Sequence, residues 1–216
     1  MKLKIKKSIA DGFSSIKANP VLILIGLFYT IIIKLLEPSY LSPLNGRITY
    51  NLSEMFFSYG GLNLIAIILV SIFINGVMIV LVAKGKKFSL ASALKLVASK
   101  YVTLVLASIL GFIINVLGLI ALILPGIFLS IKLFYFEQAV LLNNKGIVES
   151  LKTSWNVTRG NWWRVFALVI LIAIISLIII MPVSFLSKIV ADFIGGIFIV
   201  PLTVVAYTKS YLQLKR

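Results

Sequence analysis

Cysteine and histidine are both absent from the 216 residues of this chain. Without cysteine there is no disulfide framework, no thiolate nucleophile and no Cys-ligated metal. Without histidine the chain lacks the commonest general base and the commonest soft-metal ligand. Acidic side chains are also few, and none of the six carboxylates lies close enough to another in sequence to suggest a catalytic pair. We therefore expect no enzyme here, with no catalytic residue, no metal site and no cofactor.

Apolar residues, in contrast, are in large excess. They make up 61% of the chain, charged residues only 12%, and the mean hydropathy is +1.12. Soluble domains contain about 45–50% apolar and about 25% charged residues. A soluble fold of this size cannot bury that much apolar surface, because surface grows too fast relative to volume. The composition predicts an all-α protein that crosses a membrane several times.

Six apolar stretches are candidates for membrane spans, since a crossing needs about 20 residues for about 30 Å of hydrocarbon. They cover 21–37, 62–83, 101–124, 126–142, 163–182 and 189–208. The third and fourth stretches are joined only by Leu124, Pro125 and Gly126, which predicts a tight helical hairpin. We therefore expect about six transmembrane helices arranged as three hairpins.

Each hairpin is preceded by a basic, amphipathic segment, at 8–19, 89–100 and 147–161. Such segments are typical of helices that lie in the membrane interface. This pattern predicts one membrane domain, 1–216, built from three parallel units, each an in-plane helix followed by a hairpin. The units are 1–83, 84–142 and 143–216. The alternative is that any inner loop of a hairpin protein looks basic and amphipathic.

The basic residues are unevenly distributed between the two sides of such a bundle. If the N-terminus is cytoplasmic, seventeen of the 21 Lys and Arg residues fall inside, three (Lys34, Arg47 and Lys188) fall outside, and Lys132 lies within a span. The positive-inside rule therefore predicts that both termini are cytoplasmic. The net charge of +15 then indicates anionic lipid at the inner leaflet. We expect no nucleic-acid partner, because no readout motif accompanies the charge.

A resemblance to a known family is carried by residues 124–166. Leu124-Pro125-Gly126-Ile127 is followed by Lys132, then by the motif SLKTSW from Ser150 and TRGNWWRVF from Thr158. This pattern resembles the six-span membrane-domain family named after glycerophosphodiester phosphodiesterases and its YciC-like relatives. The resemblance implies a multi-pass plasma-membrane protein of a prokaryote. It implies no activity, because this chain has no soluble phosphodiesterase domain.

An ionisable residue at membrane depth is costly and is therefore a functional candidate. Lys132 lies about 10 Å into the fourth span at 1.5 Å per residue, and we expect it to face the bundle near Tyr135 and Phe136. Glu137 points to a different face, because five residues turn a helix by about 140°, so we expect it to meet Lys100 or Arg164 instead. The functional interpretation is a site for an anionic head group or substrate, and the alternative is snorkelling or a structural ion pair.

Four small or amide-bearing residues share one face of the third span, namely Ser108, Gly111, Asn115 and Gly118. Such a stripe is typical of close helix packing, with Asn115 bonding across the contact, and we expect Asn75 and Gly76 to face it. The alternative is a cavity lining. Asn115 joins Lys132, Tyr135 and Glu137 as the candidate intramembrane charge site.

A second candidate site lies at the inner interface before the fifth span. It consists of Lys152, Trp155, Arg159, Trp162, Trp163 and Arg164. Trp favours the head-group level and Arg binds phosphate with two hydrogen bonds, so the pattern indicates an anionic-lipid patch. The alternative is a docking surface for a membrane-protein partner, because Trp and Arg also dominate interface hot spots.

Two classes of function remain. The first is a non-catalytic membrane scaffold or accessory subunit that contacts anionic lipid or a partner at the inner leaflet. The second is a small transporter or lipid-handling protein with a site near Lys132. A continuous polar cavity that reaches Lys132 would favour the second class, and a filled interior would favour the first. An intramembrane hydrolase ranks below both, because the sequence shows no nucleophile–base pair.

Overall fold

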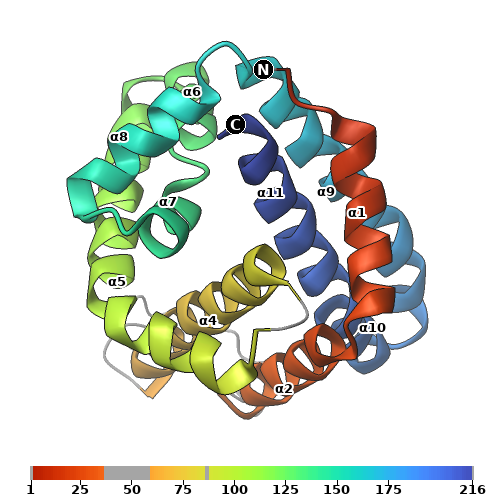
Figure 1. The fold of residues 1–216 in the computed structure, drawn as a ribbon. Helices are drawn as coiled ribbons and strands as arrows, with labels where there is room; N and C mark the ends of the chain where they lie inside the picture. Colours follow the sequence, from red (N-terminus) through yellow and green to blue (C-terminus); the bar gives the residue numbers. More distant parts are fainter. Residues whose placement is uncertain (1, 37–58, 86–87, 216) are drawn as a thin grey trace, which may run out of the picture.

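A computed structural model describes residues 2–36, 59–85 and 88–215 of the protein. Every regular element in those ranges is a helix, as the composition predicts (Figure 1). The predicted outer loop with Arg47 lies outside the described residues, as do Lys86, Lys87 and Arg216. The helices enclose a core in which α4 and α11 meet at the centre.

The helices follow the six apolar stretches closely. Their bounds are α1 Ile5–Ala18, α2 Pro20–Leu36, α4 Tyr59–Lys84, α5 Leu90–Ala121, α6 Ile123–Lys132, α7 Phe136–Asn143, α8 Ile147–Thr158, α9 Trp162–Leu186, α10 Lys188–Ile194, the π-helical turn η2 Gly195–Ile199, and α11 Val200–Leu214. Five spans in the described residues are long and apolar enough to cross a membrane. A sixth is present if α1 and α2, which are bent by 90° at Asn19, form one span. The protein is therefore an all-α, multi-span membrane protein.

The second unit departs from the expected arrangement. The amphipathic segment 89–100 is not a separate in-plane helix: it is the first part of the 32-residue helix α5, which continues into the third span. The prediction of an in-plane helix is therefore wrong for this unit, because no residue between Leu90 and Ala121 interrupts the helix. In the other two units the preceding segments do form separate helices, α1 and α8.

The hairpin between the third and fourth spans is tighter than the sequence suggests. Only Leu122 separates α5 from α6, so Pro125 and Gly126 belong to the first turn of α6. A Cβ atom on Gly118 would lie 3.2 Å from the Cα atom of Gly126. The two glycines therefore allow the backbones of α5 and α6 to approach directly, as small residues do in membrane helix pairs.

The fourth span is broken between α6 and α7. Its backbone groups at the break are satisfied by side chains of α8. Ser154 donates a hydrogen bond to the Lys132 carbonyl at 2.9 Å and accepts one from the Tyr135 N–H at 2.8 Å. Thr158 donates to the same carbonyl at 3.5 Å. Because unpaired backbone groups are costly at membrane depth, these bonds make the break tolerable.

The N-terminal helix lies along the last one. Figure 1 shows α1 beside α11, and α1 buries Ser8, Gly12 and Ile16 on the contact side. Gln213 of α11 donates to the Ser8 hydroxyl at 3.0 Å and accepts from the Lys4 N–H at 3.1 Å. The two ends of the chain are thereby held at the same side of the bundle.

A second close approach joins α2 to η2. A Cβ atom on Gly26 would collide with the carbonyl oxygen of Gly196, and one on Gly196 would collide with the hydroxyl of Thr30. Thr30 donates that hydroxyl to the Gly26 carbonyl of its own helix at 2.9 Å. The π-helical turn ends at Ile199, and Pro201 lies in the first turn of α11, which begins at Val200.

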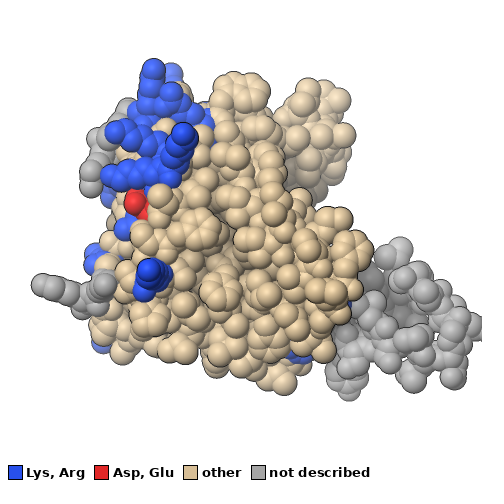
Figure 2. All heavy atoms as spheres, turned by 90° about the vertical axis from the view of Figure 1, so that its right-hand side faces the viewer, with Lys and Arg blue, Asp and Glu red and all other residues tan. Residues whose placement is uncertain are grey.

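Charge is segregated on the surface. Figure 2 shows Lys and Arg gathered toward one side of the molecule, while most of that view is uncharged. Large apolar side chains are exposed on the outer surface, including Leu186 at 88% and Phe185 and Leu124 at 79% exposure. Such surface is compatible with a lipid environment and incompatible with water.

Candidate functional site

Helix α8 divides its side chains between two faces. Ser150, Ser154 and Thr158 repeat every four residues and are fully buried. Lys152, Trp155 and Arg159 lie on the opposite side and are exposed. The spacing of three and four residues places these three on one face of the helix, which we call the α8 outer face. Of the six predicted patch residues, these three share one surface.

Lys132 lies directly beneath this face, at the end of α6. Its side chain is buried, and its ammonium nitrogen lies 5.1 Å from the ring centre of Trp155 and 5.5 Å from that of Phe128. Arg159 lies close enough for its charge to repel the ammonium. Lys132 faces the bundle as expected, but its neighbours are Phe128 and Trp155, whereas Tyr135 and Phe136 were predicted.

Trp162 completes this group, which we call the aromatic–basic cluster: Phe128, Lys132, Trp155 and Trp162. The indole N–H of Trp162 donates to the Phe128 carbonyl at 3.2 Å. The Trp162 and Phe128 rings stack with centres 5.7 Å apart. Trp163 adjoins Trp162 edge to face at 4.7 Å and is 75% exposed. All three tryptophans of the chain are therefore gathered at this surface.

Arg164, the last member of the predicted patch, has a different role. Its guanidinium donates to the Leu3 carbonyl at 3.5 Å, and Asn161 accepts from the Leu3 N–H at 3.1 Å. Arg164 therefore contributes to holding the N-terminal segment against the start of α9.

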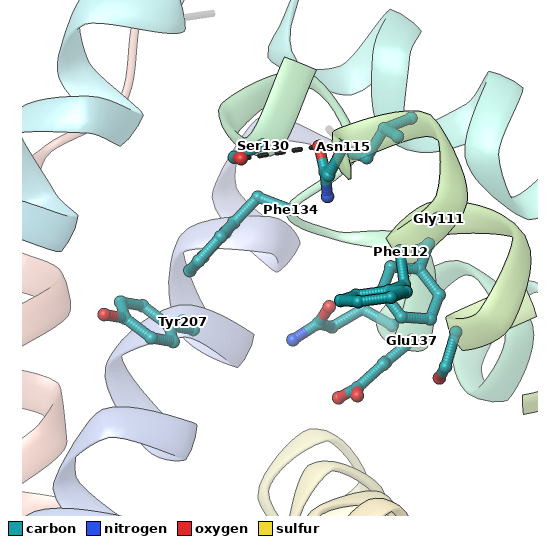
Figure 3. A pocket seen from close by; sticks show the side chains of 11 residues that line it. Gly111, Phe112, Asn115, Ser130, Phe134, Glu137 and Tyr207 are labelled. Atoms are coloured by element: carbon teal, nitrogen blue, oxygen red, sulfur yellow. Dashed lines mark hydrogen bonds between the residues drawn. The ribbon is translucent and has the colours of Figure 1, made fainter. Parts of the chain in front are cut away.

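A cavity of about 400 Å³ lies between α5, the α6–α7 break and α11. Figure 3 shows Asn115, Phe134, Glu137 and Tyr207 around it. Asn115 accepts a hydrogen bond from Ser130 at 3.4 Å, and Phe134 packs edge to face on Tyr207 with ring centres 4.6 Å apart. Ser108 and Gly111 also line the cavity, so this part of the predicted packing stripe is a cavity wall.

Glu137 lines the cavity without a charged partner among the described residues. The prediction that Lys100 or Arg164 meets it is wrong, because Arg164 contacts Leu3 and no ion pair in the described part of the chain includes Glu137. Its neighbour Gln138 is 5% exposed, and the side-chain oxygen of Gln138 has no hydrogen-bond partner. The Gln138 oxygen is thus a buried acceptor without a partner, next to a carboxylate without an ion pair in the described residues.

The candidate charge site predicted from Lys132, Tyr135, Glu137 and Asn115 is therefore divided. Lys132 belongs to the aromatic–basic cluster and does not line the cavity, whereas Glu137 and Asn115 do. Tyr135 is fully buried, and its hydroxyl is paired with that of Ser210 at 2.7 Å. Lys132 and Glu137 thus have different surroundings, as a turn of about 140° over five residues predicts.

Two glycines of the small-residue stripe pack against other helices: a Cβ atom on Gly118 would lie 3.2 Å from Gly126 of α6, and one on Gly111 would lie 3.7 Å from Leu151 of α8. Gly76 does not face the stripe. A Cβ atom on Gly76 would lie 3.0 Å from Val97 and 3.5 Å from Leu141. Gly76 therefore packs against an earlier part of α5 and against α7.

Sequence analysis did not identify Phe128, Ser154, Thr158, Gln138 or Tyr207 as site residues. Phe128 and Tyr207 look like ordinary residues of apolar spans. Ser154 and Thr158 did carry a signal, because with Ser150 they repeat every four residues through α8. That repeat indicates a buried polar face, but not which backbone it contacts.

A smaller cavity of about 260 Å³ lies at the other end of the bundle. It is lined by the ion pair between Lys34 of α2 and Asp192 of α10, whose nitrogen and oxygen are 2.5 Å apart. Both side chains are about one-third exposed, at 30% and 33%. This pair links the first and third units.

Comparison with known proteins gives one match. The model of a family described as a domain of unknown function, DUF7847, matches residues 62–213. No curated protein and no solved structure matches the chain. The matched region includes the α8 outer face, the aromatic–basic cluster and the cavity.

Proposed function

The chain belongs to the DUF7847 family, and we propose that it is a non-catalytic membrane scaffold or accessory subunit that binds anionic lipid at the inner leaflet. The binding surface is the α8 outer face together with Lys132 beneath it. Its partners are the bilayer itself, anionic phospholipids and a further membrane protein.

The observation that carries this proposal is the position of Lys132. Its ammonium is buried between two aromatic rings, beside the positive charge of Arg159. Aromatic faces stabilise a cation by about 0.5–2 kcal/mol, whereas burial and the charge of Arg159 both oppose the ammonium. A phosphate bound between Arg159 and Lys152 supplies the missing negative charge.

The distribution of charge supports an inner-leaflet location. The α8 outer face follows the short loop after α7 and precedes α9, on the side to which the positive-inside rule assigns most Lys and Arg residues. We propose that both termini are cytoplasmic and that the membrane is the plasma membrane of a prokaryote. The tryptophans next to α8 are placed as an interfacial anchor.

We also propose kinship with the membrane-domain family named after glycerophosphodiester phosphodiesterases and its YciC-like relatives. The residues that carry the resemblance contact one another: Phe128 follows the Leu-Pro-Gly-Ile motif and bonds Trp162 of the second motif. The motif is thus explained by packing around Lys132, which supports a structural, non-catalytic role.

Intrinsic tryptophan fluorescence tests the proposal without a label, because all three tryptophans lie at this surface. The protein is placed in phosphatidylcholine nanodiscs that contain either brominated phosphatidylglycerol or brominated phosphatidylcholine in the same proportion. We expect stronger quenching by the anionic lipid, since each basic residue at the surface adds about 1 kcal/mol of attraction. Equal quenching by the two lipids contradicts the proposal.

A matched pair of variants assigns the effect to α8. Lys152→Gln with Arg159→Gln removes two charges from the α8 outer face, and quenching by phosphatidylglycerol is expected to fall to the level of phosphatidylcholine. Lys17→Gln with Lys95→Gln removes two exposed charges from α1 and α5 and is expected to leave the difference unchanged. Equal effects of the two pairs indicate a general charge effect and refute a site on α8.

The cavity favours a second candidate, a small transporter or lipid-handling protein. Ser108, Asn115 and the carboxylate of Glu137 are among its lining residues, and a substrate site needs such polar groups. However, it reaches Glu137 and not Lys132, so it does not form the continuous path to Lys132 on which this alternative was based. Uptake of a substrate by reconstituted vesicles, lost on substitution of Glu137, would support it.

A further inference from the structure

We infer that the cavity beside Glu137 binds the primary ammonium group of an amphiphile that enters from the bilayer. This inference goes beyond the proposed function and does not rest on the α8 outer face. It follows from three properties of the cavity: its unpaired acceptors, its aromatic wall and its lateral access.

The acceptors define the sign of the ligand's charge. Glu137 supplies a carboxylate without an ion pair in the described residues, and Gln138 supplies a buried oxygen without a hydrogen-bond partner. Buried polar groups are normally hydrogen-bonded, so an unpartnered acceptor next to a cavity calls for a donor. A primary ammonium has three N–H donors and a positive charge, which match both groups at once.

The aromatic wall favours the same ligand. Phe112, Phe134, Phe136 and Tyr207 all line the cavity. Ring faces attract cations and also pack against an alkyl chain, so one wall serves both parts of an amphiphilic amine. The cavity volume of about 400 Å³ lies within the range of small-molecule sites, about 300–1,000 Å³.

The route of entry is lateral. Phe112 lines the cavity but is 68% exposed on the outer surface of α5. That surface belongs to a span, so its surroundings in a membrane are lipid. A ligand that enters past Phe112 comes from the bilayer and therefore carries an apolar body. The ammonium comes either from a lipid head group such as phosphatidylethanolamine or from a free lipophilic amine.

Octylamine is a suitable probe, titrated calorimetrically into the protein in phosphatidylcholine nanodiscs, with empty nanodiscs as the blank. We expect one saturable site for octylamine and none for octanol or octanoate, which lack the cation. Octyltrimethylammonium is expected to bind more weakly, since it has no N–H to donate. Saturable binding of octanol as tight as that of octylamine overturns the inference.

Variants of Glu137 and of a control carboxylate test whether octylamine binds in this cavity. Glu137→Gln keeps the shape and removes the charge, and is expected to weaken octylamine binding at least tenfold, as loss of a charged hydrogen bond does (about 1.5–3 kcal/mol). Glu149→Gln is the matched control, because Glu149 is an exposed carboxylate of α8 paired with Lys145. Unchanged binding by Glu137→Gln refutes the site.

A second variant keeps the test decisive if Glu137→Gln does not fold. Phe112→Leu alters an exposed side chain and removes one ring from the wall, with an expected loss of about threefold for octylamine. Two results together overturn the inference: the wild type binds octyltrimethylammonium as tightly as octylamine, and Phe112→Leu has no effect on octylamine binding.

The source of the ammonium is resolved by lipid composition. If phosphatidylethanolamine in the nanodisc competes with octylamine, the lipid head group is the ligand. If it does not compete, the ligand is a free lipophilic amine. Both results support the site. Failure of this inference is distinguishable from failure of the proposed function, because Glu137→Gln is expected to leave quenching by brominated phosphatidylglycerol unchanged.

Discussion

The hydroxyl of Ser154 donates to the backbone carbonyl of Lys132 across 2.9 Å, and it accepts from the N–H of Tyr135 across 2.8 Å. One side chain of α8 therefore satisfies both ends of the break in the fourth span. Lys132 precedes the break and belongs to the aromatic–basic cluster, whereas Glu137 follows it and lines the cavity. Both candidate sites therefore adjoin this contact.

Replacement of Ser154 by alanine is expected to lower stability strongly. It leaves a buried carbonyl and a buried N–H without that partner, at about 1–3 kcal/mol for each unsatisfied group. Thermal unfolding in detergent, followed by tryptophan fluorescence, measures the loss. Ser176→Ala is the control, because Ser176 bonds only within α9. Similar unfolding temperatures for the two variants contradict the role given to Ser154.

The contact between α2 and η2 can be tested by comparing two glycine substitutions in η2. Gly196→Ala is expected to destabilise the protein by several kcal/mol or prevent folding, because the added Cβ collides with Thr30. In Gly195→Ala the nearest atom is a side-chain carbon of Ile180 at 3.6 Å, an ordinary contact. The unfolding temperatures of the two variants check this, and equal tolerance refutes the close approach of the helices.

Lys132→Met separates the charge of this residue from its packing. Methionine keeps a long apolar stem between Phe128 and Trp155, so stability in phosphatidylcholine alone is expected to change by less than about 1 kcal/mol. Added phosphatidylglycerol is expected to raise the unfolding temperature of the wild type more than that of the variant. If it stabilises both equally, Lys132 has no part in lipid binding.

Much of the architecture could be predicted from the sequence, because apolar runs of span length have few alternatives. The fifth span, predicted at 163–182, is α9 from Trp162 to Leu186. The sixth, predicted at 189–208, begins at Lys188. The inward position of Lys132 followed from the cost of a lipid-facing charge.

The contacts that form the two candidate sites could not be predicted from the sequence. The break after Lys132 lies in an apolar run, and its hydrogen-bonding partners come from Ser154 and Thr158, which follow in a different helix. The cavity likewise depends on Tyr207, which lies 70 positions after Glu137. Periodicity within one segment does not contain such contacts.

The side of the membrane on which α8 lies is the most direct test of the account. The chain has no cysteine, so single cysteines introduced by Leu186→Cys, at the end of α9, and Asn156→Cys, in α8, report their own positions. Both side chains are exposed. In intact bacterial cells, a membrane-impermeant maleimide is expected to label the first variant, and to label the second only after permeabilisation. Labelling of the Asn156→Cys variant in intact cells, with none at Leu186→Cys, would contradict an inner-leaflet lipid site.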